Sequence, residues 1–479
     1  MLLTAGPWKL VLSLSVPAII GMVVVGLYNL MDAVFVGQMV GSNAMTAVSV
    51  AYPFTLVNTG VATLIGAGSA SILSRAIGKK DQSTVDRIMG NLIAWNLIFS
   101  IAITVIGMIF TGQILRLSGA EGEILDIATR YLRIIFVGST FVNFAQSANM
   151  IMRGEGRLKR AMLISGGAAV LNIVLDPILI TIMNPAGKGA EGAAYATILS
   201  QFVQAVLTLW YFLKKSRNVK IHAIRPEKEL FSEIFGVGFS AMLMQVMLLV
   251  QQTVLYNVAA QYGGGEWQTI LGATLRVQSF AFIPLWGLSQ GYQPAVGTNF
   301  GAKQYDRVKY ITKIFSIAAT LLAAIFYLPI ILAPKAMLSL FITEPEIVAQ
   351  GANDFRVFFI SYIVLGFWVV ILTLMQSLGR ASKASVLVLL RQIVIYIPAA
   401  FIMPHVAGLG VHGVFCAPLI TDVVVLIVVI WMMCSEFRHL TMKSCAKWQN
   451  FLRKKNTYAN AGISTRFLTV SPAAMISLP

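Results

Sequence analysis

The chain has 479 residues, of which 57% are hydrophobic and 11% are charged, and its mean hydropathy is +0.78. Soluble globular domains carry about 25% charged residues, so this chain has too few polar groups to cover a water-facing surface. The composition excludes a cytosolic enzyme, a disordered chain and a nucleic-acid-binding domain as the main function class. It predicts that lipid surrounds most of the chain, so the net charge of +17 is interpreted by where the charges lie.

Apolar segments long enough to cross a membrane recur from one end of the chain to the other. Each meets the requirement of about 20 residues for a helical span, and none shows the two-residue alternation of a barrel strand. We therefore predict an all-α polytopic membrane protein with twelve transmembrane helices. They are expected at about residues 10–36, 44–74, 88–112, 124–152, 158–183, 190–213, 229–260, 267–299, 308–333, 346–376, 384–405 and 410–434.

Lysine and arginine gather after the even-numbered spans, whereas acids such as Glu121, Glu266 and Glu344 follow the odd-numbered spans. Because cytoplasmic loops carry the excess of basic residues, we predict that both termini face the cytoplasm. The positive charge is then topological, and the bilayer rather than a nucleic acid is the expected partner. The basic residues include Arg75, Lys79, Lys80, Arg87, Arg153, Arg157, Lys159, Arg160, Lys214, Lys215, Lys303, Arg307, Lys309, Lys313, Arg380, Lys383 and Arg391.

The two halves of the chain share a pattern of glycine and basic residues, which indicates an internal duplication. Residues 78–80 match 301–303 and residues 156–157 match 379–380, both displaced by 223, while 189–192 match 410–413, displaced by 221. An even number of spans in each half gives the two halves the same orientation, related by an axis along the membrane normal. Two such bundles facing each other across a central cleft are typical of a rocking transporter.

The duplication predicts four parts of the chain. These are an amino-terminal six-helix bundle (1–213), a cytoplasmic linker (214–228), a carboxyl-terminal six-helix bundle (229–440) and a cytoplasmic tail (441–479) that we expect to be disordered or dispensable.

Carboxylates inside the predicted spans are the candidate functional groups, because a charge at the bilayer centre costs at least about 2.5 kcal/mol. Asp32 lies in span 1, and Asp176 lies in span 5, four residues after Asn172 and directly before Pro177. Residues four apart share one helix face, and an oxygen-rich face suits a proton or Na⁺. Two carboxylates in one dry pocket are not expected both to ionise. Alternatively, Asp32 reaches headgroup water and Asp176 stabilises a helix kinked at Pro177.

Two further ionisable residues leave a structural and a functional interpretation open. Asp422 in span 12 either makes a structural polar contact or lines a cavity. Its counterpart in the first half is Gln201. Arg276 in span 8 either pairs with a carboxylate or lines a cavity. The candidate substrate-cavity residues are Tyr28, Asn29, Gln146, Asn149, Arg276 and Asp422.

The sequence contains no P-loop motif, so ATP is not expected to act on this chain, and no catalytic constellation predicts an enzyme. Any transport is then driven by an ion gradient or by the gradient of the substrate itself, and no cofactor is expected apart from a coupling ion.

Several short motifs are distributed over both halves of the chain. They are Tyr28-Asn29-Leu30-Met31-Asp32, Arg153-Gly154-Glu155-Gly156-Arg157, Asp176-Pro177, Gly192-Ala193-Ala194-Tyr195-Ala196-Thr197 and Gly291-Tyr292-Gln293-Pro294. These motifs are similar to those of the multidrug and toxic compound extrusion (MATE) family, in its MepA-like bacterial branch, and the resemblance covers about residues 7–440.

The resemblance implies a cation site in the amino-terminal bundle formed by Asp32, Asn172, Asp176 and Thr197, with Tyr28 lining the cavity. Binding of H⁺ or Na⁺ at this site would bend span 1 and change the drug cavity. Relatives that use a carboxyl-terminal cation site have acids in spans 7 and 10, whereas span 7 here has Gln245, Gln251 and Gln252. Coupling is therefore expected in the first bundle.

The resulting expectation is a cation-coupled (H⁺ or Na⁺) multidrug efflux antiporter. It would act as a monomer in the bacterial inner membrane and export bulky, often cationic compounds by alternating access. A lipid-linked oligosaccharide flippase of the same superfamily is the main alternative, and it would need a strongly basic cleft. A membrane-embedded enzyme that modifies lipids is a second alternative, and it would need paired acidic metal-binding motifs.

Overall fold

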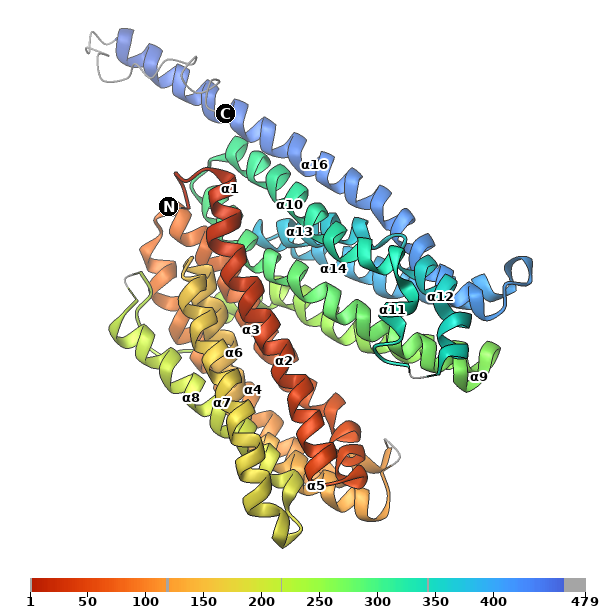
Figure 1. The fold of residues 1–479 in the computed structure, drawn as a ribbon. Coiled ribbons are helices and arrows are strands. Elements are labelled where there is room, and N and C mark those ends of the chain that lie inside the picture. The colour runs from red at the N-terminus through yellow and green to blue at the C-terminus, as the bar shows by residue number, and fades with distance from the viewer. Residues whose placement is uncertain (1, 118–119, 217, 343, 461–479) are drawn as a thin grey trace.

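The computed structural model describes residues 2–117, 120–216, 218–342 and 344–460, and within them the chain is helical with short connections. Two bundles lie side by side (Figure 1). The first contains α1 (Pro7–Leu10), the π-helical turn η1 (Val11–Ser15), α2 (Val16–Met39), α3 (Ser42–Lys79), α4 (Gln82–Leu117), α5 (Gly122–Val137), α6 (Ser139–Gly154), α7 (Leu158–Met183), η2 (Asn184–Ala186) and α8 (Gly189–Lys214).

The second bundle follows the linker. It contains α9 (Lys228–Gly301), α10 (Tyr305–Leu332), α11 (Pro334–Leu338), α12 (Pro345–Phe359), α13 (Tyr362–Ser377), α14 (Ala381–Leu389), the π-helical turn η3 (Leu390–Val394), α15 (Tyr396–Ile402), η4 (Met403–Gly408) and α16 (Val411–Asn460).

In the described residues, ten helices are long and apolar enough to cross a membrane, or eleven if the bent pair α5 and α6 is one span. Helix α9 has 74 residues, which corresponds to about 110 Å of helix, far more than the roughly 30 Å of a hydrocarbon core. The chain is non-helical at Gly264, where φ is 71°, so α9 divides there into the two predicted spans 229–260 and 267–299. The helices thus correspond to the twelve expected segments.

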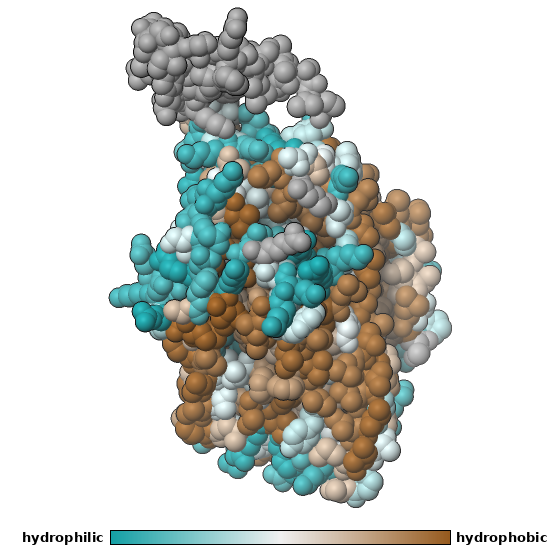
Figure 2. All heavy atoms as spheres, turned by 90° about the vertical axis from the view of Figure 1, so that its left-hand side faces the viewer, coloured by the Kyte–Doolittle hydropathy of each residue, from teal (hydrophilic) through white to brown (hydrophobic). Residues whose placement is uncertain are grey.

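The surface of the molecule has the distribution of polarity that a lipid environment requires. One face carries a broad hydrophobic belt with hydrophilic side chains above and below it (Figure 2). Large apolar side chains such as Ile182, Leu321, Ile325 and Ile427 are more than half exposed, and burial in lipid removes the cost of that exposure.

The two bundles contact each other at one end of the molecule, which we call the basic end because Lys79, Arg157, Lys303 and Arg380 lie there. Helix α1 and the carboxyl-terminal part of α16 lie at the same end (Figure 1). The Arg75 guanidinium lies 2.8 Å from the Glu233 carboxylate and joins α3 to α9.

Two glycines allow α3 and α9 to cross at close range near this end. A Cβ atom on Gly68 would collide with the carbonyl oxygen of Ile234, and a Cβ atom on Gly238 would collide with the carbonyl oxygen of Leu64. Each helix therefore presents a glycine to the backbone of the other, so the bundles meet backbone to backbone. Beside this crossing, the Ser71 hydroxyl donates to the Gln376 carbonyl of α13 at 2.6 Å.

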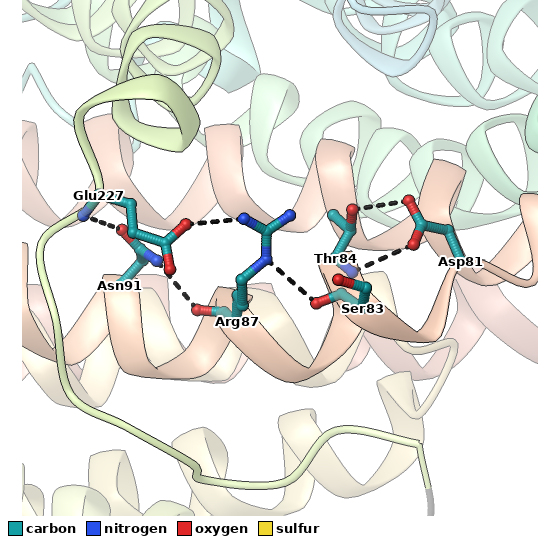
Figure 3. Close-up of polar contacts among 6 residues, drawn as sticks. All are labelled: Asp81, Ser83, Thr84, Arg87, Asn91 and Glu227. Carbon is teal, nitrogen blue, oxygen red and sulfur yellow. Dashed lines mark hydrogen bonds and ion pairs between the residues drawn. The ribbon is translucent and has the colours of Figure 1, made fainter.

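The linker between the bundles is held against α4 at the basic end (Figure 3). Arg87 forms an ion pair of 2.9 Å with Glu227, the residue before α9, and the Asn91 side-chain oxygen accepts the backbone N–H of Glu227 at 2.8 Å. In the same view, Asp81 precedes α4 and accepts hydrogen bonds from the backbone and hydroxyl of Thr84 at 3.2 and 2.6 Å, which caps the helix.

The last helix extends into the predicted tail. A disordered or dispensable tail is predicted for 441–479, and the part of it that the structure describes, 441–460, is helical rather than disordered because α16 continues to Asn460. Between Pro418 and Asn460 the sequence has no proline or glycine to end the helix. Residues 461–479 lie outside the described residues.

Candidate functional site

A cavity of about 450 Å³ lies inside the first bundle and extends to the facing surface of the second. Helices α2, α3, α5, α6, α7 and α8 all contribute side chains to it, while the second bundle contributes only from α9 and α13. This volume is within the usual range for pockets that hold drug-sized molecules. The cavity therefore belongs mainly to the amino-terminal half.

The cavity wall is rich in side-chain amides, aromatic rings and methionines. Amides donate and accept hydrogen bonds without carrying charge, aromatic faces attract cations, and methionines adapt to irregular shapes. These residues are Asn58, Gln146, Asn149, Asn172, Gln201, Gln204, Gln245, Gln290, Gln293, Gln376, Tyr28, Tyr52, Tyr131, Trp286, Met22, Met150 and Met162.

Two carboxyl groups meet at one side of this cavity. Asp32 of α2 lines the cavity, and Asp176 of α7 lies behind it, fully buried. The two side chains lie within hydrogen-bonding reach of each other. Each has a buried oxygen without a donor, Oδ1 of Asp32 and Oδ2 of Asp176. Because two bare carboxylate oxygens repel each other, a proton or a cation between them would stabilise this arrangement.

Asn172 connects the carboxyl pair to α8. Its side-chain nitrogen donates to Asp176 Oδ1 at 3.3 Å and to the Thr197 hydroxyl at 3.4 Å, and its own oxygen is buried without a donor. The structure thus brings the four predicted cation-site residues together from α2, α7 and α8. Their free oxygens match the ligands that a proton or a hard cation uses.

Of the predicted substrate-cavity residues, Tyr28, Gln146 and Asn149 line the cavity. The Asn149 amide also donates to the Ala161 carbonyl at 2.8 Å, which joins α6 to α7. The side chain of Asn29 lies outside the described residues.

Two predicted cavity residues lie elsewhere. Arg276 is exposed on α9 and is not part of the cavity wall. Asp422 is buried in the second bundle, where it forms an ion pair of 2.9 Å with Arg391. Arg391 is counted among the topological charges in the sequence pattern, yet it is 5% exposed. Asp422 therefore makes a structural polar contact and does not line the cavity, which is the first of the two interpretations left open by the sequence.

Sequence reasoning misses several wall residues, among them Tyr52, Tyr131 and Arg153. Arg153 is predicted as a topological charge, but it lines the cavity, is 9% exposed, and has a buried Nε without a partner. The amides of α8 and α9 leave a weak sequence signal, since Gln201, Gln204, Gln290 and Gln293 recur at spacings of three within apolar helices.

The fold and the site, two six-helix bundles with a polar cavity in the first of them, define a polytopic membrane protein of the transporter class. A family model described as MatE matches residues 17–178 and again 240–402. The two matches begin 223 residues apart, which is the displacement of the glycine motifs. The chain belongs to the MatE family.

Relatives and solved structures agree with this assignment. The chain is 27% identical over 417 residues to the multidrug export protein MepA of Staphylococcus aureus (strain MRSA252), covering 87% of this chain and 91% of the relative. It is 28% identical over 404 residues to MepA of Staphylococcus saprophyticus, covering 84% and 88%. A structure described as the outward-facing conformation of a multidrug resistance MATE family transporter of the MOP superfamily superposes with a TM-score of 0.86 at 27% identity, covering 92% of this chain and 98% of that one.

Proposed function

We propose that this protein is a multidrug efflux antiporter that exchanges an organic cation in its cavity for H⁺ or Na⁺ at the Asp32–Asp176 pair. The observation that carries the proposal is the position of this pair, with one carboxyl group in the cavity wall and the other buried behind it. The names of the MepA relatives support the export of several drugs.

The coupling follows from competition for one negative charge. A cationic drug in the cavity is attracted to Asp32 when the carboxyl pair carries a net negative charge, and a proton or Na⁺ entering the pair removes that attraction. A ligand shifts a conformational equilibrium only through its different affinity for the two states. Because Asp32 lies on α2 and Asp176 on α7, ion binding changes the contact between these helices, and a bend of α2 would change the cavity.

Either coupling ion suits the residues present. A proton would lie between the two carboxyl groups and satisfy the unpaired Oδ1 of Asp32 and Oδ2 of Asp176. Na⁺ would use the same two oxygens together with the unpaired Asn172 oxygen and the Thr197 hydroxyl. Ion gradients applied one at a time distinguish these cases.

The cavity accounts for a broad range of substrates. Its amides offer hydrogen bonds in many directions, and Tyr28, Tyr52, Tyr131 and Trp286 offer aromatic faces to a cation. A wall with few fixed charges selects by size and by positive charge rather than by one functional group.

We infer that the basic end faces the cytoplasm, in a bacterial plasma membrane. The positive-inside bias supports this orientation, and it places both α1 and the end of α16 on the cytoplasmic side. With this orientation, the close packing of α3 against α9 at this end would close the cavity toward the cytoplasm. In this state a drug would leave, and a coupling ion would enter, from the outer side.

A flippase for lipid-linked oligosaccharides is less well supported. Recognition of a pyrophosphate group needs several bases, whereas among the described residues that line the cavity the base is Arg153.

The test is efflux of a cationic dye from vesicles that contain purified protein, under a pH gradient or a Na⁺ gradient applied separately. Asp32→Asn and Asp176→Asn are each expected to lose gradient-driven efflux while the protein still folds. Glu229→Gln changes an exposed carboxylate of α9 and is the matched control. Wild-type efflux in both aspartate variants, at equal protein content, would contradict the proposed coupling.

A further inference from the structure

The second bundle contains a buried ion pair that the transport cycle proposed above does not use. Arg391 Nε lies 2.9 Å from Asp422 Oδ1, and the two side chains are 6% and 4% exposed. The Ser361 hydroxyl donates to the other Asp422 oxygen at 2.6 Å, and the Arg391 guanidinium lies over the Trp368 ring at 5.0 Å from its centroid. Both charges are therefore paired, hydrogen-bonded and removed from lipid and water.

Three of these side chains lie at or near irregular points of the helices, while Trp368 lies within α13. Arg391 lies in the π-helical turn η3, Ser361 lies between α12 and α13, and Asp422 follows Pro418 within α16. All four side chains are buried within the second bundle.

The internal duplication shows what lies at the same place in the first bundle. The displacement of 223 residues pairs Arg391 with Ala168 and Trp368 with Ala145, and the displacement of 221 pairs Asp422 with Gln201. Ala168 and Gln201 line the 450 Å³ cavity. In the second bundle, the hollow beside Trp368 and Asp422 measures about 10 Å³, which is close to the space of one water molecule.

We propose that Arg391, Asp422 and Trp368 form a plug that closes the second bundle to substrate and coupling ion. The plug confines both ligands to the first bundle, and this inference rests on the function proposed above.

The chemistry of the plug explains why it excludes ligands. An arginine guanidinium is itself an organic cation, and here it occupies a carboxylate and an aromatic face, the groups that would otherwise attract a cationic drug. Asp422 is already neutralised, so it offers no charge to a coupling ion. Replacing Arg391 by alanine would leave a space with the shape of a guanidinium group, next to the negative charge of Asp422.

The first experiment measures the thermal stability of Arg391→Ala with and without guanidinium chloride or methylguanidinium chloride, which probe the space left by the arginine. Purified Arg391→Ala protein in lipid nanodiscs is expected to unfold about 5 °C below the wild type, because Asp422 loses its partner. Millimolar probe is expected to restore most of that loss, whereas NaCl at the same concentration is not. Arg276→Ala removes an exposed arginine of α9 and is the control, with no loss and no response to the probe.

The second experiment separates a plug from a charged participant in transport. The double variant Arg391→Met with Asp422→Leu fills the same space without charge, and buried ion pairs are commonly replaced in this way without loss of stability. If the pair is a plug, this variant retains dye efflux within about twofold of wild type, at equal protein content. Loss of efflux by tenfold or more in a protein with wild-type thermal stability would overturn the proposal, since the charges themselves would then be needed.

A failure of the plug is distinguishable from a failure of the proposed function. Absence of any guanidinium response in Arg391→Ala would refute the plug, whatever the efflux assays show. Wild-type efflux in Asp32→Asn and Asp176→Asn would refute the coupling site, and the guanidinium response would be unaffected.

Discussion

The carboxyl groups of Asp32 on α2 and Asp176 on α7 lie within hydrogen-bonding reach, and each has a buried oxygen that no donor satisfies. Helices α2 and α7 are far apart in the sequence, and each contributes one carboxyl group to a single acidic site. A site of this kind titrates and binds ions as a unit. The predictions below begin with this property.

The effects of Asp32→Asn and Asp176→Asn on efflux are expected to be non-additive. Either substitution removes the shared charge, so each single variant should lower the efflux rate by about tenfold or more, and the double variant should lose little beyond that. Initial rates of dye efflux in vesicles, measured for the wild type, the two single variants and the double variant, provide the test. Losses that multiply in the double variant would show two independent sites.

Asn172→Leu is expected to reduce efflux more than Thr197→Val. The Asn172 amide donates to both Asp176 and Thr197, whereas Thr197 accepts a single long bond of 3.4 Å from it. Loss of the amide leaves Asp176 without its donor, while valine preserves the shape of threonine. The measurement is the dependence of the efflux rate on the driving ion, and an equal or reversed order of the two variants would contradict the assigned geometry.

Gly68→Val is expected to hold the basic end open. A Cβ atom there collides with the Ile234 backbone, so α3 and α9 cannot approach. In a background without the natural cysteines, a cysteine at Ser71, which is fully buried, should react with a maleimide at least tenfold faster when Gly68→Val is present. Gly167→Val adds the same side chain where nothing lies within 4 Å, and it should leave the reaction rate unchanged. Equal reaction rates in the protein with the cysteine alone, with Gly68→Val and with Gly167→Val would show that the crossing of α3 and α9 does not close the basic end.

The cap of α4 is expected to depend on pH. Hydrogen bonds from the Thr84 hydroxyl and backbone lower the pKa of Asp81 below its ordinary value of 3.8. A lowered pKa in the folded state means that the capping contribution is present above the unfolded value and is lost as the pH falls through the folded value. The first turn of α4 should therefore fray below about pH 4.

Hydrogen exchange at neutral pH checks the same cap without acidification. Asp81→Ala should increase exchange of the amides in the first turn of α4, by an amount that corresponds to about 1 kcal/mol, the usual contribution of a cap. Asp81→Asn, which keeps an acceptor oxygen, should show a smaller increase. Unchanged exchange in Asp81→Ala would mean that the linker contacts at Arg87 and Asn91 hold this turn on their own.

The positions of the helices could be predicted from the sequence, because the requirement of about 20 apolar residues acts locally. The ends and breaks of the helices also have local causes. The break at Gly264 separates the two spans expected at 229–260 and 267–299, whereas α16 continues to Asn460 because it has no proline or glycine after Pro418.

The candidate site could be predicted only where a carboxylate interrupts an apolar segment. Asp32 and Asp176 are conspicuous for this reason, and Asn172 follows from its spacing to Asp176. The amides of the cavity wall are less conspicuous, since a glutamine on an apolar helix faces a cavity or another helix with equal ease. Arg391 is predicted as a topological charge, and its burial depends on its contacts with Asp422 and Trp368 on other helices.

The sequence by itself determined that the chain crosses a membrane many times, that its two halves are copies, and which half carries the paired acids. Hydrophobicity, charge and repetition are properties of short segments, so they need no knowledge of distant contacts. Only the tertiary structure decided that Asp422 pairs with Arg391 and that the second bundle is filled where the first is hollow. Those outcomes depend on which side chains meet across separate helices, and helix packing sets that.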